Sequence, residues 1–136
     1  MNPVWQQLAQ AYRQEEQIYQ QVRELVGRQQ QAMEAGPDPA EVLRLCDLAA
    51  RLMSQIADIE DAIEPAKKQW EQSREDPEGD LGAALASIEA AIGEIARRQE
   101  AVQSGLLQYM QGRQQAVREA RASINVGRAR RLYRAG

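Results

Sequence analysis

The sequence predicts an all-α fold: an elongated antiparallel three-helix bundle with coiled-coil-like packing and a basic C-terminal tail. Apolar residues recur at alternating intervals of three and four over three long segments, which is the helical period. Two short segments rich in Pro, Gly and acids separate them, and such short connections make consecutive helices antiparallel neighbours. Phe and Thr are absent and Gln is abundant, a composition that disfavours a β-sheet.

The first helix is expected over residues 3–35. Glu15 and Gln29 interrupt its main apolar series, which comprises Trp5, Leu8, Tyr12, Tyr19, Val22, Val26 and Met33. A second column of apolar residues runs beside it: Val4, Ala11, Ile18, Leu25 and Ala32. The two columns form a stripe wide enough to pack against two neighbouring helices. The helix should end at "AGPDP", because Gly36 favours a left-handed conformation and Pro37 cannot continue a helix.

The second helix is expected over residues 38–74. Asp38 suits the N-cap, Pro39 the first helical position and Glu41 the third position of a capping box. Its apolar series runs without interruption through Val42, Leu45, Ala49, Leu52, Ile56, Ile59, Ile63, Ala66 and Trp70. An interior proline costs about 3 kcal/mol and removes one backbone hydrogen bond. Because the series continues beyond Pro65, we predict a kink near Asp61–Glu64 rather than the end of the helix.

The third helix follows the breaker "REDPEGDLG" and is expected over residues 80–122. Its apolar series, with Gln99 as the polar member, is Leu81, Leu85, Ile88, Ile92, Ile95, Val102, Leu106 and Tyr109. The series weakens beyond Met110, and Asn125 and Gly127 favour fraying of the helix end. We therefore divide the chain into a helical body, residues 1–110, and a basic extension, residues 111–136, with the last helix running past the body.

The net charge of −3 conceals a strong asymmetry along the chain. Residues 111–136 contain seven arginines and a single acid, Glu119, which gives this extension a charge of +6. The remaining residues 1–110 carry −9. Such a division between an acidic body and a basic end indicates an interaction segment at the C-terminus.

The residue types present exclude most enzyme classes. His, the commonest general base and metal ligand, is absent, and Cys46 is the one cysteine. No Gly-rich phosphate-binding motif occurs. We therefore expect neither catalysis nor a metal or cofactor site, and we interpret Cys46 as a small buried or half-buried hydrophobe.

The same features indicate where the protein resides. A lone cysteine indicates a reducing compartment. The start "MNPVWQQLAQAY" lacks the charged and apolar regions of a signal peptide. No apolar run approaches the roughly 18 residues of a membrane span. We therefore expect a soluble, cytoplasmic protein.

Two segments are candidates for binding partners. The first is the acidic cluster "DIEDAIE", which is either a solvated face or a docking strip for a cationic segment such as the chain's own tail; it contains Asp58, Glu60, Asp61 and Glu64. The second is the tail, where Leu132 and Tyr133 stand among arginines, including Arg130 and Arg131, and have no periodic apolar partner. The tail is thus either a short contact segment or an incidental aromatic at a frayed end.

The chain resembles the flagellar type III export chaperones of the FlgN/FliT type in two regions. One is the first helical hairpin, with a Gln-rich helix, "YQQVRELVGRQQQAMEAG", a proline break, and a helix rich in Leu, Ile and acids, "EVLRLCDLAARLMSQIADIEDAI". The other is the ending "ASINVGRARRLYRAG", with its Gly, basic residues and Tyr. The kink at Pro65 and the "GPDP" loop are departures from the family pattern.

The resemblance implies a chaperone that takes part in flagellum biogenesis. Such proteins bind the C-terminal helical segment of a hook-associated or filament-type substrate, keep it monomeric and deliver it to the export apparatus. The implied partners are therefore the substrate helix and components of the export gate or ATPase complex. Arg130, Arg131, Leu132 and Tyr133 match the family segment that contacts the export apparatus.

Two alternatives remain open on the sequence. A structural or adaptor coiled coil that acts through oligomerisation, including a homodimer, would also cover wide apolar stripes. Nucleic-acid binding through the arginines of the tail is less favoured, because the body is acidic and only one aromatic accompanies those arginines.

Overall fold

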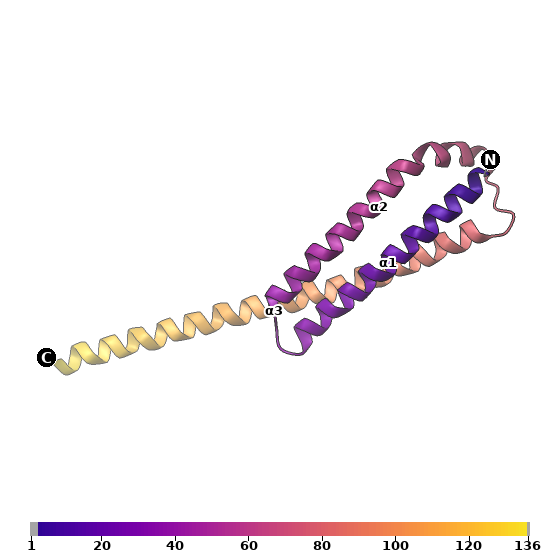
Figure 1. Cartoon of the computed structure of the whole chain (residues 1–136). Coiled ribbons are helices and arrows are strands. Elements are labelled where there is room, and N and C mark those ends of the chain that lie inside the picture. Colours follow the sequence, from indigo (N-terminus) through magenta and orange to yellow (C-terminus); the bar gives the residue numbers. More distant parts are fainter. Residues whose placement is uncertain (1–2, 136) are drawn as a thin grey trace. The chain divides into compact units, whose positions relative to one another are not determined.

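The computed structural model describes the backbone of residues 3–135 and the side chains of residues 3–122. It contains three helices, α1 (Val4–Glu34), α2 (Pro39–Ser73) and α3 (Asp80–Ala135), and the described residues form no strand (Figure 1). The predicted all-α three-helix bundle is therefore confirmed. The chain divides into two compact units, Met1–Val102 and Gln103–Gly136, each of which is considered by itself.

In the first unit, α1 packs against both other helices. One cluster of buried residues joins all three helices: Ile18, Val22 and Val26 of α1, Ile56 of α2 and Ile95 of α3. A second cluster, nearer the N-terminus of α1, contains Leu8 and Ala9 of α1 and Leu81 of α3, with Ile63, Ala66 and Trp70 of α2 packed against it. The wide apolar stripe of α1 is thus shared between two neighbours.

The connection between α1 and α2 follows the predicted turn chemistry. Gly36 has a φ of +124°, which only glycine adopts easily. The Asp38 carboxylate accepts a hydrogen bond from the Glu41 amide at 3.2 Å, as expected for an N-cap. The Glu41 carboxylate, however, pairs with Arg44 at 2.6 Å, so only one half of the predicted capping box forms.

The second connection is also held by an acidic cap. Asp76 accepts hydrogen bonds from the backbone amides of Leu81 at 3.1 Å and Gly82 at 2.9 Å, which satisfies two free donors at the start of α3. The indole of Trp70 donates to the Glu75 carbonyl at 2.8 Å and so holds the end of α2 to this loop. These contacts fix where α3 begins.

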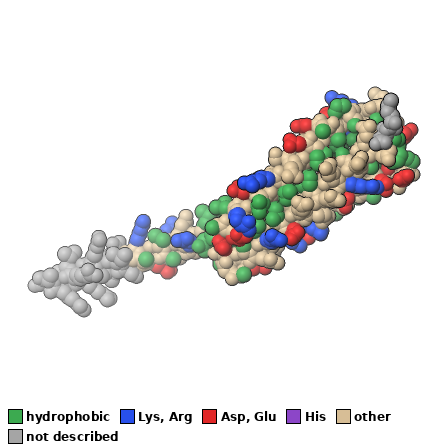
Figure 2. All heavy atoms as spheres, in the orientation of Figure 1, with side chains coloured by type: hydrophobic (Ala, Val, Ile, Leu, Met, Phe, Trp, Pro, Cys, Tyr) green, Lys and Arg blue, Asp and Glu red, His purple; other side chains and the backbone are tan. Residues whose placement is uncertain are grey.

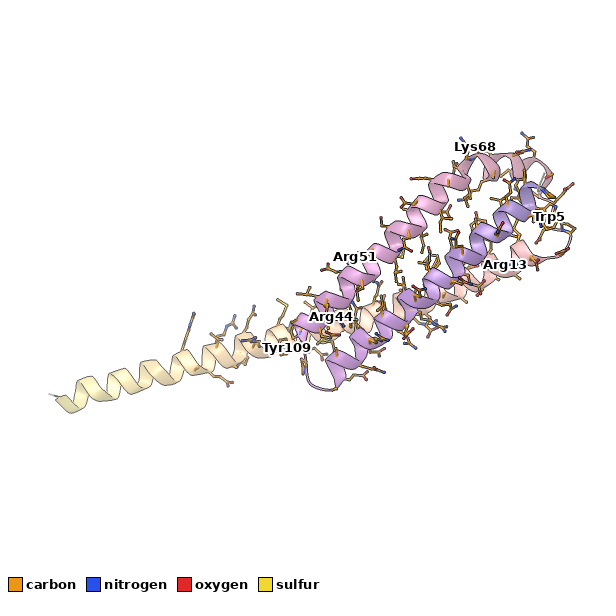
Figure 3. The ribbon with its side chains drawn as sticks, in the orientation of Figure 1. Trp5, Arg13, Arg44, Arg51, Lys68 and Tyr109 are labelled. Carbon is orange, nitrogen blue, oxygen red and sulfur yellow. The ribbon has the colours of Figure 1, made fainter. Side chains whose placement is uncertain are left out.

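The apolar series of α2 faces inward as predicted, and no member of it is exposed. The helix runs through Pro65 without a break. Figure 1 shows the C-terminal part of α2 bending toward the N-terminal end of α1, and Lys68 lies at this bend in Figure 3. The proline therefore does not end the helix.

The predicted series of α3 is wrong at three positions: Leu85, Ile92 and Gln99 are exposed. The buried face passes instead through Ala84 and Ala91, which are 4% and 2% exposed. The alanines therefore lie on the buried face of α3, and the larger neighbours lie at its edge. This shift leaves Leu85 and Ile92 as surface apolar residues, 39% and 44% exposed.

The end of α3 also differs from the expectation, because the helix continues to Ala135 rather than ending near residue 122. Asn125 and Gly127 each lower helix stability by only about 0.5–1 kcal/mol relative to Ala. The surrounding Arg and Ala residues are among the best helix formers. Two weak positions therefore do not end a helix in this sequence.

The two units meet between Val102 and Gln103, whereas the sequence analysis divided the chain after residue 110. Val102 is the last buried residue of α3 among those described. Beyond it, Leu107 and Met110 are 59% and 56% exposed. The periodic apolar pattern thus extends farther along α3 than the core does.

A matched pair of substitutions in α2 tests the core. Leu45 is fully buried, whereas Leu43, two residues away, is 66% exposed. We expect Leu45→Ala to lower the free energy of unfolding by about 2–5 kcal/mol, because it leaves a cavity. Leu43→Ala should change it by no more than about 0.5 kcal/mol. Urea denaturation followed by circular dichroism measures both, and equal effects would contradict the assigned packing.

Candidate functional site

An open apolar groove lies between α2 and α3, with α1 as its floor. Its larger part has a volume of about 410 Å³. Tyr19 and Val22 form the floor, and the walls are mainly aliphatic. The principal wall residues are Cys46, Ala50 and Met53 of α2 and Ile92, Ala96 and Gln99 of α3. We call this feature the α2–α3 groove.

A second hollow, of about 180 Å³, continues the groove toward the N-terminal end of α1. Leu8 and Tyr12 of α1, Lys67 and Glu71 of α2, and Leu85 of α3 line it. In each helix these residues belong to the same three–four series as those of the larger hollow, so both hollows open on one side of the bundle. The α2–α3 groove thus consists of two separate hollows on the same side of the bundle.

Large apolar side chains stand on the groove walls in contact with solvent. Met53 of α2 is 41% exposed, and Ile92 of α3 is 44% exposed. Cys46 is exposed as well, rather than buried or half-buried as expected, and its sulfur accepts a hydrogen bond from the Gln29 amide at 2.9 Å. An apolar strip of this kind usually marks a surface that binds a partner.

Acidic residues stand between the two hollows. On α2, Glu60 and Glu64 continue the helical series that links Met53 to Lys67, and on α3 Glu89 lies between Leu85 and Ile92. Glu64 and Glu89 are exposed. Exposed acidic residues of α2 and α3 thus lie between the two hollows, whose own linings are mostly apolar.

A buried carboxyl group interrupts the apolar packing of α1 at the middle of the bundle. Glu15 is 1% exposed, and its Oε2 atom has no hydrogen-bond partner among the described residues. Its side chain shares a hydrogen bond with Glu60 of α2. Glu60 also accepts a hydrogen bond from Lys67, whose ammonium lies 5.9 Å from the centre of the Tyr12 ring.

The two carboxyl groups of this cluster differ in their pKa values and therefore in their charge. Burial, reinforced by the Glu60 hydrogen bond and charge, raises the pKa of Glu15 to about 8. For Glu60, burial raises the pKa, but hydrogen bonds from Lys67 and Glu15 outweigh this effect and lower it. At neutral pH, Glu15 is therefore mainly protonated and donates to an ionised Glu60, which is paired with Lys67.

Ion pairs also join α1 to α3. Arg13 lies 2.5 Å from Asp80 at the start of α3 (Figure 3). Farther along, Glu94 pairs with Arg23 of α1 at 3.0 Å and with Arg98 at 2.8 Å. These pairs are partly exposed, so each adds little stability but favours one register of the two helices. Figure 2 shows charged side chains interspersed with hydrophobic ones on the visible face of the first unit.

The structure separates the four residues of the predicted acidic strip. Asp58, Asp61 and Glu64 are exposed, whereas Glu60 is half-buried and bonded to Lys67. Glu60 thus belongs to the buried cluster, and the docking role of the strip stays a prediction. Four tail residues lie outside the residues whose side chains are described: Arg130, Arg131, Leu132 and Tyr133.

The sequence analysis did not assign a role to Glu15 or Gln29, although both interrupt the apolar series of α1. The structure buries both side chains, and the Gln29 amide also donates to the Val42 carbonyl at 3.2 Å. A polar residue at a position where the helical period requires an apolar one is the signal that could have identified them. Such residues often fix the register of packed helices.

Two features are absent from the described part of the chain. Its side chains contain no cluster of His, Cys, Asp and Glu that could hold a metal ion. None of its helices has the length and apolar character needed to cross a membrane.

Replacing the buried carboxyl group should alter the pH dependence of stability. Between the ordinary glutamate pKa of 4.5 and about 8, folded Glu15 keeps its proton while the unfolded chain releases it. The free energy of unfolding should therefore fall as pH rises, by up to about 1.4 kcal/mol per pH unit. We expect Glu15→Gln to flatten this slope, because the amide can still donate to Glu60 but does not titrate.

Urea denaturation of both proteins at several values between about pH 5 and pH 8 measures the slope. Glu24→Gln is the matched control, since its side chain is 66% exposed on the same helix, and it should retain the slope of the original protein. An unchanged slope in Glu15→Gln would contradict the assigned protonation state.

No protein-family model matches the chain, and no curated protein or solved structure does either. Three features of the chain itself therefore bear on function: the α2–α3 groove, the buried carboxyl pair, and the division of charge between the acidic body and the basic extension.

Proposed function

We propose that the chain is a non-catalytic, helix-binding chaperone of the flagellar export type. In this proposal the α2–α3 groove binds the C-terminal helical segment of a hook-associated or filament-type substrate, and the chaperone delivers that substrate to the export apparatus. The open apolar groove is the observation that carries the proposal. The resemblance of the helical hairpin and of the basic ending to FlgN/FliT-type chaperones supports the choice of substrate.

A bound helix would cover the apolar side chains that the three helices leave exposed on the groove walls. An amphipathic helix presents apolar side chains at intervals of three, four and seven residues, which suits an elongated groove. Met53 and Ile92 on opposite walls would then lose their contact with water, at a gain of about 25 cal/mol per Å² of apolar surface buried. The substrate would at the same time have its own apolar face covered, which prevents premature assembly.

The exposed acidic residues between the two hollows favour a substrate helix with basic residues. A helix with basic residues beside its apolar stripe would place them near Glu64 and Glu89, whereas acidic residues there would be repelled. Such complementarity mainly sets the choice and orientation of the partner. Because the groove is open, the substrate can be released without unfolding the chaperone.

The tail would contact a different partner. Arg130, Arg131, Leu132 and Tyr133 lie beyond the residues that line the groove. We propose that they contact the export gate or the ATPase complex. Substrate binding and delivery would then depend on separate parts of one chain.

Permanent oligomerisation is the second candidate function. Leu107, Met110 and Val117 of α3 are exposed large apolar residues outside the first unit, and they favour this alternative. An adaptor of this kind would stay assembled whether or not an export substrate is present.

A charge introduced into the groove tests the first function. The probes are the C-terminal segments of the hook-associated proteins and flagellins encoded in the same genome, titrated into the full chain by isothermal calorimetry. We expect one segment to bind at one-to-one stoichiometry. Ile92→Glu should weaken that binding at least about tenfold, because a buried unpaired charge costs several kcal/mol.

Leu43→Glu is the matched control, since Leu43 is an exposed apolar residue that does not line the groove. It should leave the affinity unchanged. Failure of all segments to bind, or equal affinity for the Ile92→Glu protein, would contradict the proposed site.

The tail is tested by Tyr133→Ala. This substitution should leave the affinity for the export segment unchanged and weaken binding to the purified cytoplasmic domain of the export gate. Calorimetry with each partner separates the two effects. Unchanged binding to both partners would remove the role assigned to Tyr133.

A further inference from the structure

In the distal part of α3, Gln103–Ala135, three large apolar side chains form an exposed stripe. We call this part the distal segment. Leu107, Met110 and Val117 are 59%, 56% and 49% exposed. Met110 and Val117 are one heptad apart, and the sequence continues the spacing at Ile124. Isolated helices draw little stability from propensity alone, so a stripe of this kind calls for a packing partner.

The charges of the distal segment complement those of the α2–α3 groove. Arg113, Arg118 and Arg121 are exposed beside the apolar stripe, and the acid among them is Glu119. Glu64 of α2 and Glu89 of α3 are exposed between the two hollows of the groove. Residues 111–136 together carry +6, against −9 for the rest of the chain.

The dimensions also agree. The two hollows together span Cys46 to Glu71 of α2, which corresponds to about 37 Å at 1.5 Å per helical residue. Residues 103–122, which contain the exposed stripe, form a helical stretch of about 30 Å. The stretch therefore fits within the length of the groove.

We propose that the distal segment of one copy docks as a fourth helix in the α2–α3 groove of a second copy, so that two isolated chains form a reciprocal dimer. Each copy then contributes the residues that complete the groove of the other. The inference rests on the proposed function in one respect: the export substrate uses the same groove and must displace the distal segment.

Other arrangements of the stripe are less favourable. Two distal segments packed in parallel against each other would bring their Arg113, Arg118 and Arg121 side chains together, and like charges on facing helices repel. Docking within one chain would require a break in α3, which is one continuous helix through Val102 and Gln103. Docking in a second copy pairs opposite charges and leaves α3 intact.

Sedimentation velocity of the full chain, from about 1 to 100 μM, tests the proposal. We expect a dimer whose dissociation constant rises with salt, because exposed charge pairs are screened. The tail variant R113E/R118E/R121E and the groove variant Ile92→Glu should both be monomeric over the range in which the original protein is dimeric. Leu43→Glu should remain dimeric, and circular dichroism confirms that each variant is folded.

Mixing two charge-reversed proteins identifies the contact itself. The first is the tail variant, and the second is a rim variant, E64R/E89R, in which the groove walls become basic. Each alone should be a monomer, because its tail and groove have the same sign. Their mixture should form a heterodimer in which both contacts pair opposite charges.

Each outcome has a definite meaning. A heterodimer in the mixture, with a monomeric Ile92→Glu protein, supports the proposal. A monomeric original protein overturns it, and so does a dimer that is lost in the tail variant but kept in Ile92→Glu, since that result indicates contact between two distal segments. A monomer that still binds an export segment would leave the proposed function standing and remove this inference alone.

Discussion

The packing of α1 against two helices at once is the constraint on which the rest of the first unit depends. Val22 and Val26 are buried in a cluster that also contains Ile56 of α2 and Ile95 of α3. Because α1 packs against both α2 and α3, it forms the floor of an open groove, and the other two helices form its walls. Ala84 and Ala91 lie on the buried face of α3, whereas Ile92 lies on the groove wall. The core and the candidate binding surface therefore have one origin.

The buried polar groups set this packing to a single register. A stripe of Leu, Ile and Val alone could slide by one heptad with little loss of apolar contact. Glu15 finds its hydrogen-bond partner only when Glu60 and Lys67 of α2 lie beside it. Gln29, nearer the C-terminal end of α1, requires the same register, because its amide donates to the Val42 carbonyl and the Cys46 sulfur of α2. The cost of burying these groups is offset where they are paired, and a shifted register would leave them unpaired.

Helical period and turn chemistry allowed most of the fold to be predicted from sequence. The cap at Asp38, the turn at Gly36 and the passage of α2 through Pro65 follow from local rules. The buried face of α3 did not, because a period of three and four is compatible with burial of either Leu85 or Ala84, and the structure buries Ala84. The position of the groove between α2 and α3 was not predicted, for the same reason. Whether Ile92 is buried or exposed depends on which face of α3 packs into the core, and tertiary packing decides that face.

The thiol of Cys46 permits the most direct test of the central claim that the α2–α3 groove is the binding surface. It is the chain's one cysteine, and it lies on the groove wall. The rate of its reaction with N-ethylmaleimide can be measured on the dilute, unassembled chain, at high concentration, and with a saturating export segment. Occupation of the groove by either helix should slow the reaction severalfold. A rate that neither assembly nor segment binding changes would place the binding surface elsewhere.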